Sequence, residues 1–222
     1  MISILIPLYN GIEFLEQSLK SVINQTYTNW EVIIGINGHP PNSITEHMAI
    51  SIKESLFNDN KIRIIYYNTE GKAETLNAMK NDSKYDFIAI LDVDDLWHPY
   101  KLEKQIPYIK DYHVVGTKCC YFGDITFSPS IPTGDLSEID FLESNPIINS
   151  SVIVHKSCFN VDTTSKIEDY ELWLKLKYEN KKFFNIADIL CYHRIHKTSA
   201  FNNTNHLYVD EIKQKWFYAF NP

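Results

Sequence analysis

The sequence predicts an α/β fold in which a mostly parallel central sheet is flanked by helices. Along residues 1–95, short apolar runs without a helical period alternate with amphipathic stretches of helical length. Buried strands separated by such crossovers form parallel sheets that are covered on both faces, with right-handed connections. The chain has 222 residues, of which 44% are hydrophobic and 22% charged, and can bury one sizeable core. We therefore expect a single domain over residues 1–222.

The first half is predicted to begin with a buried strand, because the apolar run from Ile2 to Leu8 ends at the turn-forming Tyr9-Asn10-Gly11. A helix should follow, since apolar residues recur on one stripe from Ile12 to Ile23 while charged residues lie opposite. The alternation then repeats. We expect further strands at 30–36, 62–67 and 87–91, and helices at 43–56 and 72–80.

The pattern changes after Asp95. Pro99 suits the first turn of a helix, which Pro107 should kink or shorten. An aromatic cluster at 216–220 should pack a last helix against the core. Alternatively, these side chains would form a surface that binds a sugar or contacts a membrane. We also expect strands near 114–118, 151–154 and 183–192, an irregular stretch at 128–134 and a helix at 168–178.

Composition excludes several classes of protein. The formal charge of −7 and the pI near 5.6 give no electrostatic basis for binding nucleic acid or an anionic membrane surface. Cys119, Cys120, Cys158 and Cys191 show no C-x-x-C spacing, so we expect reduced thiols and a cytoplasmic location. The N-terminal apolar run is short and stopped by Pro7, and we expect neither a signal peptide nor an integral membrane segment.

The strongest chemical signal follows the strand at 87–91, where Asp92, Asp94 and Asp95 place three carboxylates within four residues. Ligands of parallel sheets bind at the carboxyl ends of the strands. Carboxylates this close raise one another's pKa unless a cation neutralises them, and oxygen ligands suit Mg²⁺ or Mn²⁺, which also bind phosphates. We favour a metal and phosphate site; a capping Asp with two solvated neighbours is the alternative. The pattern alone does not separate sugar transfer from phosphoryl transfer.

Ordered motifs flank this cluster. They are S-I-L-I-P-L-Y-N at 3–10, Q-T-Y-T-N-W-E at 25–31, G-K-A-E-T-L-N at 71–77, L-D-V-D-D-L-W-H-P-Y-K-L-E-K-Q at 91–105, N-S-S-V at 149–152, E-D-Y-E-L-W at 168–173 and Y-H-R-I-H-K-T-S at 192–199. Together they resemble the family-2 glycosyltransferases of GT-A fold, inverting enzymes that use nucleotide-sugar donors. The block at 91–105 is similar to that family's L-D-x-D-D-x-x-x-P-x-x-L-x-x-Q segment, and the resemblance runs from Ser3 to about Ser199.

The resemblance implies a GT-A fold, Rossmann-like, with a nucleotide-sugar-binding half at 1–95 and an acceptor-side, catalytic-base half at 96–222. Most members carry a D-D-G-S-type turn after the second strand, with an Asp that binds the nucleobase, whereas this chain has Asn37. A hydrogen bond to a neutral amide oxygen is weaker than one to a carboxylate by ~1 kcal/mol. The nucleobase of the donor is therefore left unassigned, although UDP is the expected carrier. The implied donor-binding residues are Pro7, Tyr9, Asn10, Asn37, Lys72, Asp92 and Arg194.

The resemblance also implies the catalytic groups. Asp94 would bind Mn²⁺ or Mg²⁺, together with Asp95 and His196 or together with Asp92. The alternative role of Asp92 is to bind the ribose. Asp169 would be the catalytic base, with an N-terminal charge that complements a helix dipole as the alternative. Arg194 and His196 could instead be packed, hydrogen-bonded residues without a ligand. Lys72 could instead be an exposed lysine at the start of a helix, with no role in binding. In the family's Y-R-x-H-x-x-S ending, Arg194 and His196 align and His193 is the extra residue.

We therefore expect a metal-dependent glycosyltransferase that moves a sugar from a nucleoside-diphosphate sugar to a saccharide, lipid-linked or protein acceptor. One alternative is a haloacid-dehalogenase-type phosphohydrolase, with Asp92 as nucleophile and Asp94 as acid. That class places its motif near the chain start, whereas about ninety residues precede it here. The other is an inactive nucleotide- or glycan-binding module, which only the Asn37 turn favours. The sugar, the acceptor and the oligomeric state are not predicted.

Overall fold

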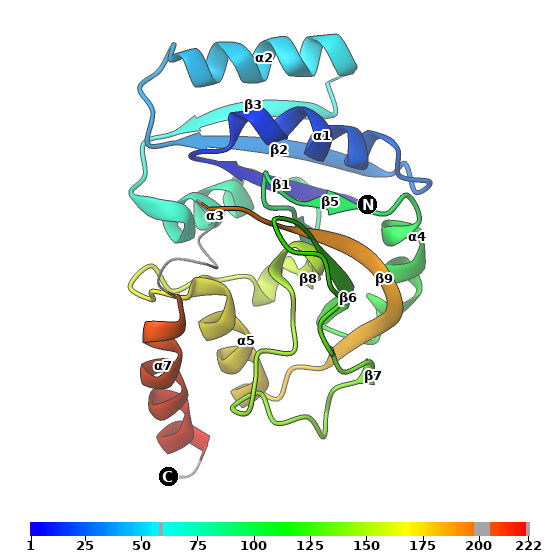
Figure 1. Cartoon of the computed structure of the whole chain (residues 1–222), viewed down its shortest axis with the longest axis vertical. Coiled ribbons are helices and arrows are strands. Elements are labelled where there is room, and N and C mark those ends of the chain that lie inside the picture. The colour runs from blue at the N-terminus through cyan, green and yellow to red at the C-terminus, as the bar shows by residue number, and fades with distance from the viewer. Residues whose placement is uncertain (58–59, 198–204, 221–222) are drawn as a thin grey trace.

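The computed structural model of the protein describes residues 1–57, 60–197 and 205–220. Ser199, the last residue of the motif series, lies outside these ranges. The N-terminal half consists of β1 (Ile2–Leu8), α1 (Ile12–Ile23), β2 (Trp30–Asn37), α2 (Ile44–Leu56), β3 (Ile62–Tyr67), α3 (Gly71–Asp82) and β4 (Phe87–Ile90). Its strands pair in parallel in the order β3-β2-β1-β4, of which Figure 1 labels the first three. The predicted alternation and the parallel pairing are confirmed here.

The C-terminal half continues the same sheet with mixed pairing. Its elements are β5 (Leu96–Trp97), α4 (Lys101–Gln105), β6 (Val114–Gly123), β7 (Gly134–Asp135), β8 (Ile153–His155), α5 (Glu168–Tyr178), β9 (Phe183–Ile195) and α7 (Asn205–Phe220). The sheet runs on from β4 as β8-β6-β9-β5, with β7 on β9. Strand β8 is antiparallel to both β4 and β6, whereas β6 and β9 are parallel.

Some boundaries differ from the prediction. The helix expected after Pro99 is the short α4, followed by a 3₁₀ turn at Ile106–Tyr108 that contains Pro107. Proline has no N–H to continue the α-helical hydrogen bonding. The strand expected near 151–154 begins only at Ile153, because Asn149–Ser151 form a 3₁₀ turn. Strands β6 and β9 extend further than expected, to Gly123 and Ile195.

Alternating side chains of the buried strands supply two hydrophobic cores, one on each face of the sheet. On β1, Leu5 faces a core with α3, α5 and α7, while Ile4 and Ile6 face a second core with α1, α2 and α4. Successive side chains of a strand point to opposite faces, so a strand buried on both faces is apolar throughout. All seven residues of β1 are buried, although Ser3 and Pro7 are not large apolar residues.

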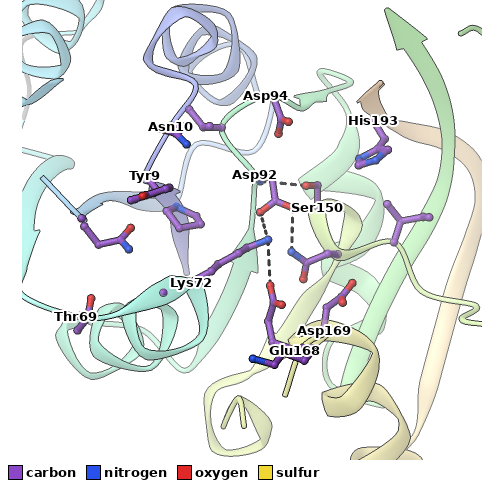
Figure 2. Close-up of a pocket in the computed structure, with 18 of the residues that line it drawn as sticks. Tyr9, Asn10, Thr69, Lys72, Asp92, Asp94, Ser150, Glu168, Asp169 and His193 are labelled. Atoms are coloured by element: carbon purple, nitrogen blue, oxygen red, sulfur yellow. Dashed lines mark hydrogen bonds and ion pairs between the residues drawn. The ribbon is translucent and has the colours of Figure 1, made fainter. Parts of the chain in front are cut away.

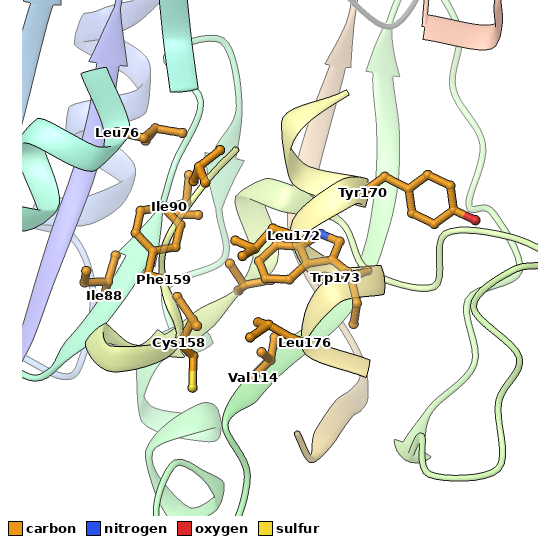
Figure 3. Close-up of a cluster of buried hydrophobic side chains, with 14 of the residues drawn as sticks. Leu76, Ile88, Ile90, Val114, Cys158, Phe159, Tyr170, Leu172, Trp173 and Leu176 are labelled. Atoms are coloured by element: carbon orange, nitrogen blue, oxygen red, sulfur yellow. The ribbon is translucent and has the colours of Figure 1, made fainter. Parts of the chain in front are cut away.

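Helix α5 is fixed by the first of these cores. Its Leu172, Trp173 and Leu176 pack beside Ile88 and Ile90 of β4 (Figure 3). Trp173 and Leu176 are 0% and 1% exposed, and burying such side chains contributes roughly 1.5–3 kcal/mol each. The start of α5 is thereby held near the end of β4, where the acidic cluster lies.

Helix α7 packs on α5 through a buried carboxylate. Glu171 accepts hydrogen bonds from Trp216 Nε1 (2.8 Å) and Lys215 Nζ (2.5 Å). Trp216 also contacts the Tyr178 ring, at 5.6 Å between centroids. The expected packing of the terminal aromatic cluster is confirmed for this residue, whereas Phe217 and Tyr218 are exposed.

The second core contains a fully buried lysine. Lys101 is 0% exposed; its Nζ donates to Gln105 Oε1 (2.8 Å) and lies 4.0 Å from the centroid of the Trp97 ring. Burial lowers the pKa of Lys101 to about 7, because an ammonium group loses hydration there.

We expect the stability of Lys101→Met relative to that of the wild-type protein to fall as the pH rises from 7 to 10. In that range the unfolded lysine, with a pKa of about 10.4, binds more protons than the folded one, so the wild-type protein gains stability with pH. Methionine has nothing to titrate. Urea unfolding of both proteins between pH 6 and 10 measures the difference, and a constant difference over this range would contradict the lowered pKa.

Candidate active site

A cavity of about 780 Å³ opens where the carboxyl ends of β1, β2 and β4 meet the N-termini of α3 and α5 (Figure 2). Eight of the eleven predicted site residues line it: Pro7, Tyr9, Asn10, Asn37, Lys72, Asp92, Asp94 and Asp169. His196 lines an adjoining cavity of about 450 Å³, which Asp94 also lines. Arg194 and Asp95 line neither cavity.

A tight turn after β4 separates the three neighbouring carboxylates. The Asp95 N–H donates to the Asp92 carbonyl oxygen (3.0 Å), and this turn aims Asp92 and Asp94 into the cavity. Asp95 points inward and is 0% exposed. Its carboxylate accepts the Arg194 N–H (2.8 Å) and bonds His193 Nδ1 (3.0 Å). These contacts turn the Asp95 oxygens toward buried protein partners and give no support to the prediction that Asp95 is a metal ligand.

His193, which sequence matching treats as an extra residue, lines the main cavity. Burial lowers the pKa of His193, but the charge of Asp95 and their hydrogen bond outweigh it, and the pKa rises to about 9. The imidazole is thus a cation at neutral pH. Strand alternation is the sequence signal that bears on His193: neighbouring side chains of a strand point to opposite faces, so His193 and Arg194 cannot both face the cavity.

Arg194 is the neighbour that points away from the cavity. Its Nε donates to the Asp94 carbonyl oxygen and its Nη2 to Gln17 Oε1, both at 2.8 Å. The guanidinium lies between the rings of Phe14 and Phe122, 4.6 and 4.4 Å from their centroids. The side chain thus fastens the Asp94 turn to α1, and this arrangement gives no support to the prediction that Arg194 contacts the donor.

Lys72 connects the two sides of the cavity. Its Nζ lies 2.6 Å from Asp92 Oδ1 and 3.5 Å from Glu168 Oε1 (Figure 2). Burial lowers the pKa of Lys72, but the charges of Asp92 and Glu168 outweigh it and raise the pKa. The Asn149 side-chain amide donates to Asp92 Oδ2 (3.1 Å), and the backbone N–H of Asp92 donates to Ser150 Oγ (3.1 Å). Burial raises the pKa of Asp92, yet Lys72 lowers it overall.

Asp169 is the second residue of α5 and lines the cavity beside Glu168. Burial, and then the charge of Glu168, raise the pKa of Asp169 to about 6, although Lys72 acts in the opposite sense. At neutral pH such a carboxylate is ionised and still accepts a proton readily. Glu168 was visible in the sequence only as part of a motif, and the structure adds it to the site.

Asp94 and His196 face each other between the two cavities, with 2.9 Å between Asp94 Oδ2 and His196 Nε2. Burial, followed by the charges of Asp95 and Asp92, raises the pKa of Asp94. A cation placed near this carboxylate would relieve the repulsion.

The turn after β2 forms the far wall of the cavity. Asn37 is 2% exposed and lines it together with Gly38. Gly38 has a φ of 72°, and a Cβ atom there would lie 2.2 Å from the Tyr9 ring. The close approach of Tyr9 to this turn therefore requires glycine.

An α/β sheet of this type, with carboxylates, a lysine and a histidine gathered at one edge, is typical of enzymes that bind nucleotides. Comparison with known protein families agrees: residues 3–162 match the model of glycosyl transferase family 2. The chain belongs to this family and is a glycosyltransferase, which removes the dehalogenase alternative.

Two curated relatives match over most of the chain. The O-antigen biosynthesis glycosyltransferase WbnJ of Escherichia coli is 28% identical over 90% of this chain and 82% of its own length. The UDP-Glc:alpha-D-GlcNAc-diphosphoundecaprenol beta-1,3-glucosyltransferase WfgD of Escherichia coli is 27% identical over 97% of this chain and 84% of its own length.

Solved structures share the fold at low sequence identity. S. aureus TarS 1–349 in complex with UDP-GlcNAc has a TM-score of 0.74 at 13% identity, over 98% of this chain and 72% of that one. The mannosyltransferase PcManGT of Pyrobaculum calidifontis, in complex with GDP-Man and Mn²⁺, has a TM-score of 0.66 at 16% identity, over 89% of this chain. This chain spans 58% of the PcManGT chain. The predicted GT-A fold is confirmed.

Among the described residues, no helix is both long and apolar enough to cross a membrane.

We expect Asp95→Ala and Asp94→Ala to fail in different ways. The first removes the buried acceptor of the Arg194 N–H and of the His193 cation, and should lower the free energy of unfolding by ~2–4 kcal/mol. The second changes a cavity-facing residue, and should leave stability within ~1 kcal/mol of wild type. Urea denaturation of the two variants compares them directly; equal losses of stability would contradict the division into buried and cavity-facing carboxylates.

Proposed function

We propose that the protein is a metal-dependent, inverting glycosyltransferase that moves a sugar from a UDP-linked donor to the hydroxyl of a lipid-linked saccharide. The observation that carries this proposal is that Asp94 and Asp169, from the two halves of the chain, line one cavity. Inverting transfer needs a stabilised diphosphate on one side of the anomeric carbon and a base for the attacking hydroxyl on the other. Residues 1–95 would bind the donor, and residues 96–222 the acceptor.

The donor would lie along the strand ends. Pro7, Tyr9 and Asn10 follow or end β1 and would contact the base and ribose, while the buried Asn37 amide oxygen would accept the N–H of uracil. Asp92 is already ionised by its contact with Lys72 and would accept a ribose hydroxyl. His193, a cation in the same cavity, would face the negative charge of the diphosphate.

Asp94 and His196 have the donor atoms that a divalent ion requires, a carboxylate oxygen and an imidazole nitrogen. In the described part of the chain, no group of three His, Cys, Asp or Glu side chains is placed to hold an ion. Diphosphate oxygens and water would supply the other ligands, as they commonly do for Mg²⁺ and Mn²⁺. When bound, the ion would add the positive charge that stabilises the departing diphosphate.

Asp169 would act as the general base. Its carboxylate takes the proton of the acceptor hydroxyl while that oxygen bonds to the anomeric carbon and the bond to the diphosphate breaks. With a pKa raised to about 6, the group is ionised at pH 7 and has more basicity than an ordinary aspartate.

The relatives support the substrate class. WfgD, by its name, takes UDP-Glc and acts on a GlcNAc-diphosphoundecaprenol, and WbnJ belongs to O-antigen biosynthesis. We extend a UDP-sugar donor and a lipid-linked saccharide acceptor to this chain, with other glycan or protein acceptors as the wider class. The free state of all four cysteines supports a cytoplasmic location.

The proposal is tested by nucleotide release. The protein is incubated with Mn²⁺, Mg²⁺ or EDTA, a panel of UDP-, GDP- and CDP-sugars and undecaprenyl-diphosphate-linked GlcNAc. We expect release of UDP that depends on the ion, and a product of inverted anomeric configuration. Retained configuration or full activity in EDTA would overturn the mechanism, and binding of donor without release would support the inactive module.

We expect Asp169→Asn to lower kcat by ~10²–10⁴-fold with little change in donor binding, since the amide cannot take a proton. In the wild-type protein, kcat should fall as the pH drops below about 6, where Asp169 becomes protonated. Steady-state kinetics between pH 5 and 8 and calorimetry with UDP measure both effects. Asp111→Asn, at an exposed position outside the cavity, is the control. Wild-type turnover by Asp169→Asn would show that another group is the base.

A further inference from the structure

Two charged side chains meet across the cavity from opposite halves of the chain. Lys72 is in the first turn of α3, and Glu168 is the first residue of α5. Lys72 Nζ lies 3.5 Å from Glu168 Oε1 and 2.6 Å from Asp92 Oδ1, so one ammonium group joins α5 to the end of β4 (Figure 2). The two side chains are 37% and 22% exposed, so this contact is only partly screened by solvent.

The first turn of α5 lacks the usual local restraint. Ile167 at the N-cap position offers no side-chain acceptor, and no capping hydrogen bond is formed there. The apolar core holds the helix from Tyr170 onward, and Lys215 and Trp216 of α7 bond the Glu171 carboxylate. The ion pair with Lys72 adds a restraint from outside the helix at Glu168, the residue next to Asp169.

We propose that Lys72 and Glu168 act as a pair of positioning residues for Asp169, joining the turn that carries it to the donor side of the cavity. The inference rests on the proposed role of Asp169 as the base. It assigns Glu168 no contact with the substrate and gives Lys72 a second role besides neutralising Asp92.

The charges that face Asp169 determine how each residue of the pair should affect it. Burial and the carboxylates of Glu168 and Asp92 raise the pKa of Asp169, whereas the ammonium of Lys72 lowers it. The same cavity is lined by Lys166 and His193, which add positive charge. Removing the charge of Lys72 should therefore make Asp169 harder to ionise, and removing that of Glu168 should make it easier.

These opposite effects distinguish the pair from residues that merely stabilise the fold. We expect Lys72→Met to move the acid limb of the kcat–pH profile up by about 0.5–1 pH unit, and Glu168→Gln to move it down by a similar amount. Both variants should lose kcat at the optimum by about tenfold, because the first turn of α5 is less well fixed. Lys72→Arg keeps the charge and should restore the wild-type acid limb.

The experiment uses the full chain with UDP-sugar, metal ion and acceptor between pH 5 and 8.5, and carboxyl NMR titration of Asp169 without ligands. Lys80→Met, in the last turn of α3, and Glu179→Gln, at the residue that follows α5, are matched controls outside the cavity that should leave the profile unchanged. Glu168→Gln alone keeps the inference testable if Lys72→Met does not fold.

The outcomes separate the two proposals. If Asp169→Asn is inactive but Lys72→Met and Glu168→Gln leave the acid limb and the NMR titration unmoved, the pairing role is overturned and the base assignment stands. If both variants shift the limb in the same direction, the electrostatic coupling is overturned. If Asp169→Asn transfers sugar at the wild-type rate, the base assignment itself fails, whatever the two variants do.

Discussion

The antiparallel pairing of β8 with β4 is the constraint on which the site depends. The two strands match Ala89 with Ile153, so the residues that follow β4 meet the residues that precede β8. Asp92 follows β4, and Asn149 and Ser150 precede β8; their side chains bond the carboxylate and the N–H of Asp92. A parallel β8 would place that segment at the opposite edge of the sheet. The change of strand direction therefore brings the second half of the chain to the cavity.

Buried hydrogen bonds then fix the 3₁₀ turn at 149–151. Trp97 Nε1 donates to the Ser150 carbonyl oxygen (2.6 Å), and Gln105 Nε2 donates to those of Ser151 (2.8 Å) and Val115 (2.6 Å). Each bond contributes about 1 kcal/mol, and leaving any of these groups unpaired would cost more. The acidic block at 91–105 thus has two functions: its first residues face the cavity, and its later ones hold the opposite wall of that cavity in place.

The sequence predicted what depends on local pattern and failed where a distant partner decides. Apolar runs and helical periods located the parallel half, and the family resemblance placed Asn37, Lys72 and Asp92 among the donor-binding residues, which line one cavity. Asp94 and Asp95 have the same side chain, and only the turn and the buried partners on β9 orient them differently. Alternation along β9 predicts that His193 and Arg194 point apart, but not which faces the cavity. The pair of Lys72 with Glu168 joins residues far apart in sequence.

Carboxylates of one chemical type acquire different proton affinities in this cavity because Lys72 is placed asymmetrically among them. Lys72 contacts Asp92 at 2.6 Å and lowers its pKa, while Asp94 and Asp169 receive less compensation and have raised pKa values. Groups whose environments separate their proton affinities are suited to different tasks. An Asp92 whose pKa is lowered by Lys72 suits hydrogen bonding to a neutral ligand group. An Asp94 whose pKa is raised by burial and by the charges of Asp95 and Asp92 favours a bound cation. Asp169, whose pKa is raised by burial and by the charge of Glu168, is suited to accept a proton.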